Sequence, residues 1–214
     1  MGQCASVFKK AENVEQDTDN AVQQPYVLVI VGPSGVGKGT LISALMTTDD
    51  PSPFAFSVSH TTRKPRPGEK DGVHYHFTNK ETFQAEIAEG KFIEHANVHD
   101  NIYGTSFKAV EQVQKDNKCC ILDIDVQGAR QVRASSLKAM IVFIAPPNVE
   151  TLEKRLRGRG TETEEQIKLR TANSLAELQS VEKEPGLYDA VLTNDDFKTC
   201  LGELRKVAAT ALQG

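Results

Sequence analysis

The sequence predicts an α/β fold in which helices cover both faces of a mostly parallel, five-stranded sheet. Two observations lead to this prediction. Three largely apolar runs, Tyr26–Val31, Lys118–Asp125 and Ala139–Ala145, are continuous rather than alternating, which is typical of strands that are buried on both faces. Each run is followed by residues with helical spacing, and such alternation of strand and helix along a chain favours parallel pairing.

The other core elements follow from the same patterns. Further strands are predicted at Phe54–Ser59 and Asp189–Thr193. Apolar residues at helical spacing, together with capping residues, predict helices at Lys38–Met46, at Gly128–Ala134, from Asn148 to about Arg157, from the capping-box stretch Thr161–Glu164 to about Glu182, and from Phe197 onward.

The stretch from about residue 60 to residue 115 does not alternate in this way, and we interpret it as an inserted, small α+β subdomain. It begins with a basic loop rich in Pro and Gly at Thr61–Gly72. Strands and helices are then expected at His74–Phe77, Lys80–Glu89, Phe92–Val98 and Phe107–Lys115. The predicted organisation is a flexible leader (1–24) and one domain (25–214), in which the core (25–59 and 116–214) carries the insertion (60–115).

Composition narrows the possible functions. The 214 residues carry a formal net charge of −4, so no general attraction to nucleic acid is expected. No apolar run approaches the length of a membrane span. The four cysteines lack the spacing of a metal site and favour a reducing, cytoplasmic compartment; they are Cys4, Cys119, Cys120 and Cys200.

A glycine-rich stretch separates the first strand from the first helix. Its residues are Gly32, Pro33, Ser34, Gly35, Val36, Gly37, Lys38, Gly39 and Thr40. Glycines let successive backbone N–H groups point inward as an anion nest, to which the positive end of the next helix adds, and Lys38 supplies a full charge for nucleotide phosphates. Gly39 stands where this motif usually has Ser or Thr, so magnesium is expected to be contacted through water. The alternative is a glycine-rich turn without a ligand.

Two basic clusters indicate further anion sites in an otherwise acidic protein. Arg63, Lys64 and Arg66 lie in a loop that Pro65 and Pro67 stiffen, and guanidinium groups bind phosphate oxygens in pairs. The second cluster surrounds a glycine-containing break between two helices; its members are Lys154, Arg155, Arg157, Arg159 and Arg170. The alternatives are a solvated loop and ordinary surface Arg–Glu pairs. A donor loop, a second phosphate site and a helical lid at about 150–172 together have the layout of a nucleoside monophosphate kinase.

Seven blocks of sequence resemble the guanylate kinase family, in the family's order. They are GPSGVGKGT, FSVSHTTRKPRPGEKDGVHYHF, FIEHANV, IYGTS, ILDIDVQGAR, FIAPPNVETLEKRLRGRGTETEEQI and VLTND. The resemblance covers nearly the whole chain from Tyr26, and it implies a P-loop kinase fold with a GMP-binding insertion and with ATP bound by the glycine-rich stretch. The implied reaction is in-line transfer of the γ-phosphoryl group of ATP to GMP, and to dGMP, with Mg²⁺. A monophosphate oxygen is already an anionic nucleophile, so no general base is nominated.

The resemblance also carries site roles to matching positions. Ser59 and Glu94 would read the guanine edge, because a carboxylate can accept from two adjacent donors, N1–H and N2–H₂, that adenine does not present. Thr40 and Asp125 would serve the metal through water, and Asn194 would lie near the adenine of ATP. The rest of the GMP-binding set is Arg63, Arg66, Tyr75, Tyr103, Thr105 and Asp123. The catalytic set is Lys38, Arg155, Arg159 and Arg170.

Two other functions compete with this one. A GTPase is disfavoured, because Asp125–Gly128 fits its D-x-x-G element but neither Asn79-Lys80 nor Asn117-Lys118 continues as the guanine-reading N-K-x-D element. The alternative is a catalytically silent guanylate kinase-like module that binds a phosphopeptide. Such a module would be expected to lose the loop lysine or the lid arginines, which are present here.

The first six residues fit M-G-x-x-x-[ST], the signal for N-myristoylation of Gly2, and Cys4 could take palmitate as a second anchor. For a eukaryotic source this motif predicts a membrane tether, and the alternative is a chance match. His95 and His99 have i,i+4 spacing but fall in a predicted strand and loop, so a metal site is not expected there. We expect a monomer.

Overall fold

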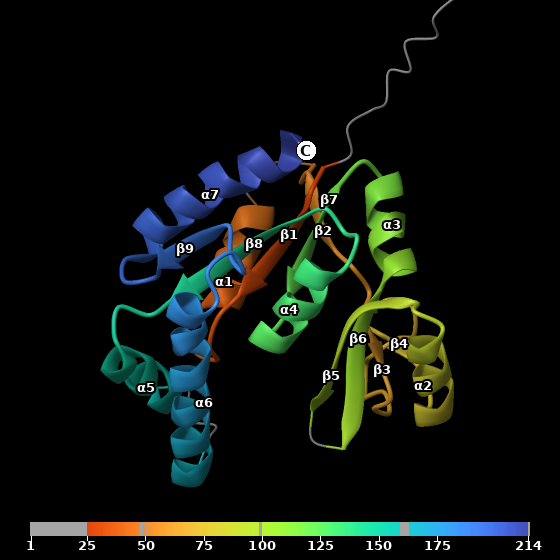
Figure 1. Ribbon diagram of the computed structural model, residues 1–214, viewed down its shortest axis with the longest axis horizontal. Helices are drawn as coiled ribbons and strands as arrows, with labels where there is room; N and C mark the ends of the chain where they lie inside the picture. The colour runs from red at the N-terminus through yellow and green to blue at the C-terminus, as the bar shows by residue number, and fades with distance from the viewer. Residues whose placement is uncertain (1–24, 48, 50, 99, 159–162, 214) are drawn as a thin grey trace, which may run out of the picture.

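The computed structural model describes residues 25–47, 49, 51–98, 100–158 and 163–213 (Figure 1). Four residues of interest lie outside the described residues; they are Gly2 and Cys4 of the lipidation motif, His99, and the predicted lid residue Arg159. In the part of the chain that the structure describes, the helices are too short or too polar to cross a membrane.

A five-stranded parallel sheet forms the core, which confirms the predicted fold class. Its strand order is β2-β7-β1-β8-β9, and every pairing is parallel. The strands are β1 (Val27–Val31), β2 (Phe54–Phe56), β7 (Cys119–Asp123), β8 (Ala139–Ala145) and β9 (Ala190–Thr193). Because β1 lies between β7 and β8, the residues that follow these three strands meet at one edge of the sheet, where ligands bind in open α/β folds.

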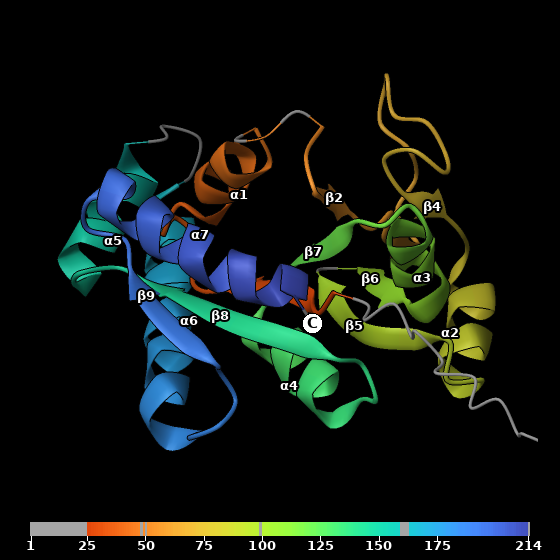
Figure 2. The same cartoon turned by 90° about the horizontal axis from the view of Figure 1, so that it is seen from above.

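Helices cover both faces of this sheet (Figures 1 and 2). The side chains of β1 alternate between two hydrophobic clusters: Leu28 and Ile30 pack with α1 and α7, whereas Val27, Val29 and Val31 pack with α3 and α4. This division explains why β1 reads as one continuous apolar run. The helices are α1 (Lys38–Met46), α3 (Phe107–Lys115), α4 (Val126–Ala134), α5 (Val149–Arg157), α6 (Glu164–Lys183) and α7 (Phe197–Gln213).

A second, four-stranded sheet lies beside the core (Figure 1). Its order is β4-β3-β6-β5, with β3 parallel to β4 and with both β3–β6 and β5–β6 antiparallel. The strands are β3 (His60–Thr61), β4 (His76–Phe77), β5 (Phe92–Val98) and β6 (Asn101–Ser106). Helix α2 (Lys80–Ala88) covers it through Phe83, whose ring stacks on that of Phe92 at a centroid distance of 4.3 Å.

The structure corrects several local expectations. Strand β6 was not predicted, and Thr61 of β3 was placed in the basic loop. Helix α4 begins at Val126 rather than at Gly128, because Asp125 caps it: the Asp125 Oδ1 accepts a hydrogen bond of 2.8 Å from the Gly128 N–H. The capping box of α6 is formed by Thr163 with Gln166, two residues later than the predicted Thr161–Glu164 box.

Candidate active site

The glycine-rich stretch forms a tight loop between β1 and α1. Gly35 and Gly37 have φ values of +89° and +102°, which L side chains rarely adopt. Space excludes side chains as well: an added Cβ would lie 2.8 Å from the Leu156 side chain at Gly35 and 2.7 Å from the Asn194 amide at Gly37. Gly37 is the N-cap of α1, and because glycine has no side chain that could cap the helix, the first N–H groups of α1 can bind an anion.

Lys38 connects this loop to the neighbouring strand. Its Nζ donates to the Gly32 carbonyl at 2.5 Å and lies 3.7 Å from Asp123 Oδ1, at the end of β7. The surrounding protein raises the pKa of Asp123 by removing its carboxylate from water, and the charge of Lys38 opposes this rise. The Asp123 side chain is still 38% exposed, because it faces a cavity.

That cavity, of about 290 Å³, lies between the two sheets, and we call it the Glu94 cavity. Its polar lining residues are Ser57, Ser59, Tyr75, Glu94, Tyr103, Thr105, Asp123 and Asp125. The structure therefore brings together all of the predicted GMP-binding residues except Arg63 and Arg66. Residues of the small sheet, from β5 and β6, meet here with residues of the core sheet, from β2 and β7.

Glu94 is buried, with only 6% of its surface exposed. The pairing of β5 with β6 shifts register between Phe92 and Glu94, a β-bulge that sets Glu94 opposite Thr105. Burial raises the pKa of Glu94, hydrogen bonding to Thr105 opposes the rise, and the charge of Asp125 adds to it. The result is a carboxylate in a low-dielectric cavity, where pairing with N–H donors is strongly favoured over leaving it unpaired.

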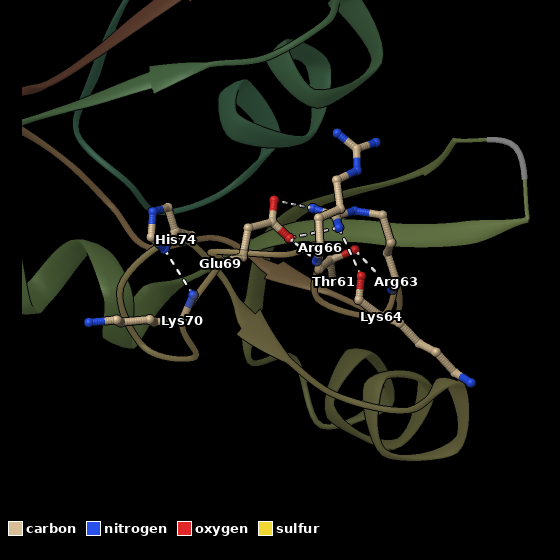
Figure 3. Close-up of polar contacts among 7 residues, drawn as sticks. All are labelled: Thr61, Arg63, Lys64, Arg66, Glu69, Lys70 and His74. Carbon is tan, nitrogen blue, oxygen red and sulfur yellow. Dashed lines mark hydrogen bonds and ion pairs between the residues drawn. The ribbon is translucent and has the colours of Figure 1, made fainter.

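The basic loop is closed by Glu69 (Figure 3). Its carboxylate accepts two hydrogen bonds from the Arg63 guanidinium, at 2.8 and 2.9 Å, and one of 2.6 Å from the Arg66 backbone N–H. The Glu69 N–H donates to the Arg66 carbonyl at 3.0 Å across Pro67 and Gly68, and Gly68 has a φ of +87°, as a type II turn requires. These contacts lower the pKa of Glu69 to about 2, first through Arg63 and then through the Arg66 backbone.

The two loop arginines are held differently. The Arg63 guanidinium also donates to the Lys64 carbonyl, and its central carbon lies 5.4 Å from the centre of the Tyr75 ring, which lines the Glu94 cavity. Arg66 is exposed, and Figure 3 shows its guanidinium directed away from Glu69. Arg63 is therefore fixed next to the cavity, whereas Arg66 presents its charge to solvent.

Two arginines of the predicted lid contact the glycine-rich loop (32–40), which we call the phosphate loop after its predicted role. Arg155 of α5 donates to the Val36 carbonyl at 3.3 Å and to the Asn194 carbonyl at 2.9 Å. Arg170 of α6 donates to Ser34 Oγ at 3.0 Å. Asn194 is buried, and its amide donates to the Val36 carbonyl at 2.7 Å, so this residue braces the loop.

The predicted metal-shell residues come from two elements, Thr40 from α1 and Asp125 from the N-cap of α4. Thr40 is exposed on the first turn of α1. Asp125 uses Oδ1 to cap α4, which leaves Oδ2 for a metal-bound water. No group of three or more His, Cys, Asp or Glu side chains that could hold a metal occurs within the described ranges. This donor set fits Mg²⁺, which keeps several waters and is usually held by one or two carboxylates together with nucleotide phosphates.

The sequence analysis missed two residues of this region, Glu69 and Gln131. Glu69 had a visible signal, because it is an acid directly after a Pro-Gly turn in a basic loop. Gln131 on α4 hydrogen-bonds the backbone of His95 on β5, in the strand that carries Glu94. Its contact has no local signal, because it depends on how α4 packs against β5.

Comparison with known proteins agrees with this geometry. The "Guanylate kinase" family model matches residues 24–211. Guanylate kinase 1 of Oryza sativa subsp. japonica is 61% identical over 180 residues, which are 84% of this chain and 47% of that protein. Guanylate kinase of Schizosaccharomyces pombe is 51% identical over 180 residues, which are 84% of this chain and 88% of that protein.

A solved structure is also similar. The crystal structure of guanylate kinase from Anaplasma phagocytophilum matches with a TM-score of 0.61 and 28% identity, over 89% of this chain and 88% of that chain. The chain spans about half the length of the rice relative, and nearly all of the yeast one. Since the family model covers most of the chain and these relatives match it over more than four fifths of its length, the chain belongs to the guanylate kinase family.

Proposed function

We propose that this chain transfers the γ-phosphoryl group of ATP to GMP, and to dGMP, with Mg²⁺ as cofactor. One observation carries the proposal: a single cavity contains both the buried Glu94 and Asp123, which lies 3.7 Å from Lys38 of the phosphate loop. A group that can recognise guanine and a group next to the ATP-binding loop thus share one space. The reacting phosphates would meet between them.

The acceptor side is proposed to select the base and hold the monophosphate. Glu94 accepts from N1–H and N2–H₂ of guanine, and the Ser59 hydroxyl donates to O6. Adenine in the same place would leave the Glu94 carboxylate without these donors, which is a costly loss for a buried charge. The phosphate is held by Tyr75 and Tyr103, whose rings lie 6.0 Å apart, and by the nearby loop arginines Arg63 and Arg66.

The donor side is proposed to supply positioning and positive charge. The first N–H groups of α1 and the Lys38 ammonium bind the β- and γ-phosphates of ATP, and Lys38 then exchanges its present contacts for phosphate oxygens. Arg155, Arg159 and Arg170 neutralise the charge that develops on the transferred group. Mg²⁺, when bound, would withdraw charge from the phosphate oxygens. Thr40 and Asp125 would hold the waters of this ion. At the other end of ATP, Asn194 would lie near the adenine.

A coupled assay of ADP release, with GMP, dGMP, AMP, CMP and UMP as acceptors, tests this function. We expect turnover with GMP and dGMP only. Glu94→Gln should lower kcat/KM for GMP by about two orders of magnitude, because an amide cannot accept at both positions. GMP binding without any release of ADP would instead favour the phosphopeptide-binding module. Turnover with AMP equal to that with GMP would refute the proposal.

The remaining expectations concern the cell rather than the chemistry. We propose a cytoplasmic monomer that is tethered to a membrane through acylated Gly2 and Cys4. Sedimentation velocity of the purified chain tests the monomer. Mass spectrometry of the native N-terminus tests the tether, and an unmodified Gly2 together with a free Cys4 thiol would exclude it.

A further inference from the structure

Helix α4 packs beside strand β5 (Figure 1), and its residue Gln131 hydrogen-bonds the backbone of that strand. The His95 N–H donates to Gln131 Oε1 at 3.1 Å, and Gln131 Nε2 donates to the His95 carbonyl at 2.9 Å. Strand β5 is an edge strand of the small sheet, so among the described strands none pairs with the outer backbone groups of His95. The Gln131 amide takes the place of that strand at one residue.

That residue directly follows Glu94, and the same helix forms the wall against which Glu94 lies. A Cβ added to Gly128 would come within 3.2 Å of Glu94 Oε2, so the absence of a side chain at residue 128 makes room for the carboxylate. The Gly128 N–H is held by Asp125, which caps the helix and lines the Glu94 cavity. Helix α4 thus sets both the position of the strand and the space for the side chain.

We infer that Gln131 is a positioning residue for guanine recognition, an inference that rests on the proposed function. By pinning the backbone of His95 to α4, it fixes the distance between Glu94 and the core residues that share the cavity, notably Asp123. Hydrogen bonds weaken steeply when the donor and acceptor move out of line, so a small slide of β5 costs the paired bonds from Glu94 to the base. Gln131 would therefore determine base selectivity without touching the nucleotide.

Other contacts keep β5 in place as a strand, which separates positioning from folding. Ile93 is buried in the hydrophobic cluster beneath α4, and β5 pairs with β6 along most of its length. Loss of the Gln131 contact should therefore leave the fold intact and let β5 shift by a small amount. The expected consequence is weaker discrimination between bases rather than a large loss of stability.

The test is Gln131→Glu, which preserves the size of the side chain. A carboxylate can accept from the His95 N–H but cannot donate to the His95 carbonyl, so one bond becomes a contact between two acceptors. Inosine monophosphate (IMP) keeps N1–H of guanine and lacks the 2-amino group, so the ratio of GMP to IMP affinity measures the placement of Glu94. We expect this ratio to fall about tenfold, with the affinity for ATP unchanged.

Gln127→Glu is the matched control. It adds the same charge one turn earlier on α4, from an exposed side chain, and should leave the GMP/IMP ratio as in the wild type. In a Glu94→Gln background, Gln131→Glu should cause no further fall in the ratio, because the group that it positions has been changed already. A full second fall would contradict the inference.

Affinities are measured by titration calorimetry, so that turnover is not required. An unchanged GMP/IMP ratio in Gln131→Glu would overturn the inference, as would an equal loss of GMP and IMP affinity together with a lower melting temperature. If the wild type binds GMP but releases no ADP, the proposed function fails while the ratio still decides the role of Gln131. If the wild type binds neither nucleotide, both proposals fail.

Discussion

The phosphate loop and the Glu94 cavity are built by different means, although both serve phosphate chemistry in our proposal. The loop relies on backbone: glycines whose conformation and space exclude side chains, and a helix N-terminus. The cavity relies on side chains carried by strands of both sheets, together with contacts between segments that are 36 residues apart in the chain, as with Gln131 and His95. The first kind of site is encoded locally, and the second depends on the assembled fold.

The donor and acceptor sides of the proposed site also hold their cations differently. At the loop, Lys38 is held between a carbonyl and Asp123, ready to exchange these partners for phosphate. At the basic loop, on the acceptor side, the Glu69 carboxylate accepts two parallel hydrogen bonds from Arg63, which fix the position of the guanidinium. The donor side should therefore be sensitive to loss of charge, and the acceptor side to loss of geometry.

The largest effect is expected at Lys38. Lys38→Met removes the full charge that we propose faces the β- and γ-phosphates, and kcat should fall by about 10²–10³-fold. GMP affinity should stay near the wild-type value, because Lys38 does not line the Glu94 cavity. The same substitution at Lys80, the first residue of α2, is the control and should leave kcat unchanged. Equal losses in GMP affinity and kcat would show that the two regions are not separable.

The two carboxylates on the proposed acceptor side, Glu94 and Glu69, should become protonated at different pH values as the pH falls. Burial raises the pKa of Glu94, so its ionised form, which we propose accepts from guanine, is lost at a pH above the ordinary value of 4.5. The pKa of Glu69 is lowered to about 2, so its contacts with Arg63 survive through that range. Below the raised pKa, kcat/KM for GMP should fall about tenfold per pH unit, and Glu94→Gln should flatten this limb of the profile.

The contributions of Glu94 and Glu69 to the free energy of unfolding should change with pH in opposite directions. For Glu94 the folded state binds the proton more tightly than the unfolded state, so its contribution to the free energy of unfolding rises as the pH falls through the raised pKa. For Glu69 the contribution is present above pH 4.5 and is lost as the pH falls toward 2. Denaturant titrations over pH 3–7 give the difference in the free energy of unfolding between the wild type and each of the variants Glu94→Gln and Glu69→Gln. If this difference changed with pH in the same direction for both variants, the assigned environments would be contradicted.

A smaller effect is expected at Glu69 itself near neutral pH. Glu69→Gln weakens the hold on Arg63 and on the backbone of Arg66, and the KM for GMP should rise about tenfold with the KM for ATP unchanged. Glu81→Gln, on the exposed surface of α2, changes the same charge in the same subdomain and serves as the control. If the KM for ATP rose as much as that for GMP, the loop would have a general structural role instead.

The core sheet was predictable because its central strands β7, β1 and β8 are continuous apolar runs that are each followed by a helix. Strand β6 was not, since Asn101–Ser106 mixes polar residues with Gly104 and has no period, and its extended form follows from pairing with β5. Gly104 is needed there because an added Cβ would lie 2.7 Å from the Glu94 carbonyl. Strand β3 has only two residues, too few for any pattern, whereas β4, also of two residues, lies within the strand predicted at His74–Phe77.

The candidate site divides in the same way. The glycines and Lys38 follow from a local pattern, and the roles of Glu94 and Tyr75 came from the family resemblance. The contacts of Arg155 and Arg170 with Val36 and Ser34 depend on how α5 and α6 pack over the loop, which no spacing in the sequence encodes. Long-range contacts of this kind are decided by tertiary packing, so sequence patterns do not report them.

The smallest effect concerns Gly39, where the loop departs from its usual pattern. An added Cβ at this residue meets no atom within 4 Å, so Gly39→Ser fits without strain. A serine in the first turn of α1 should raise the free energy of unfolding by about 0.5 kcal/mol, because glycine is the poorer helix former. It also places a hydroxyl where the loop can contact Mg²⁺ directly, so the Mg²⁺ concentration for half-maximal activity should fall several-fold.

Gly39→Ala separates the two effects: it should stabilise α1 at least as much and leave the Mg²⁺ requirement unchanged. An equal shift in both variants would mean that the helix, and not the hydroxyl, limits metal use.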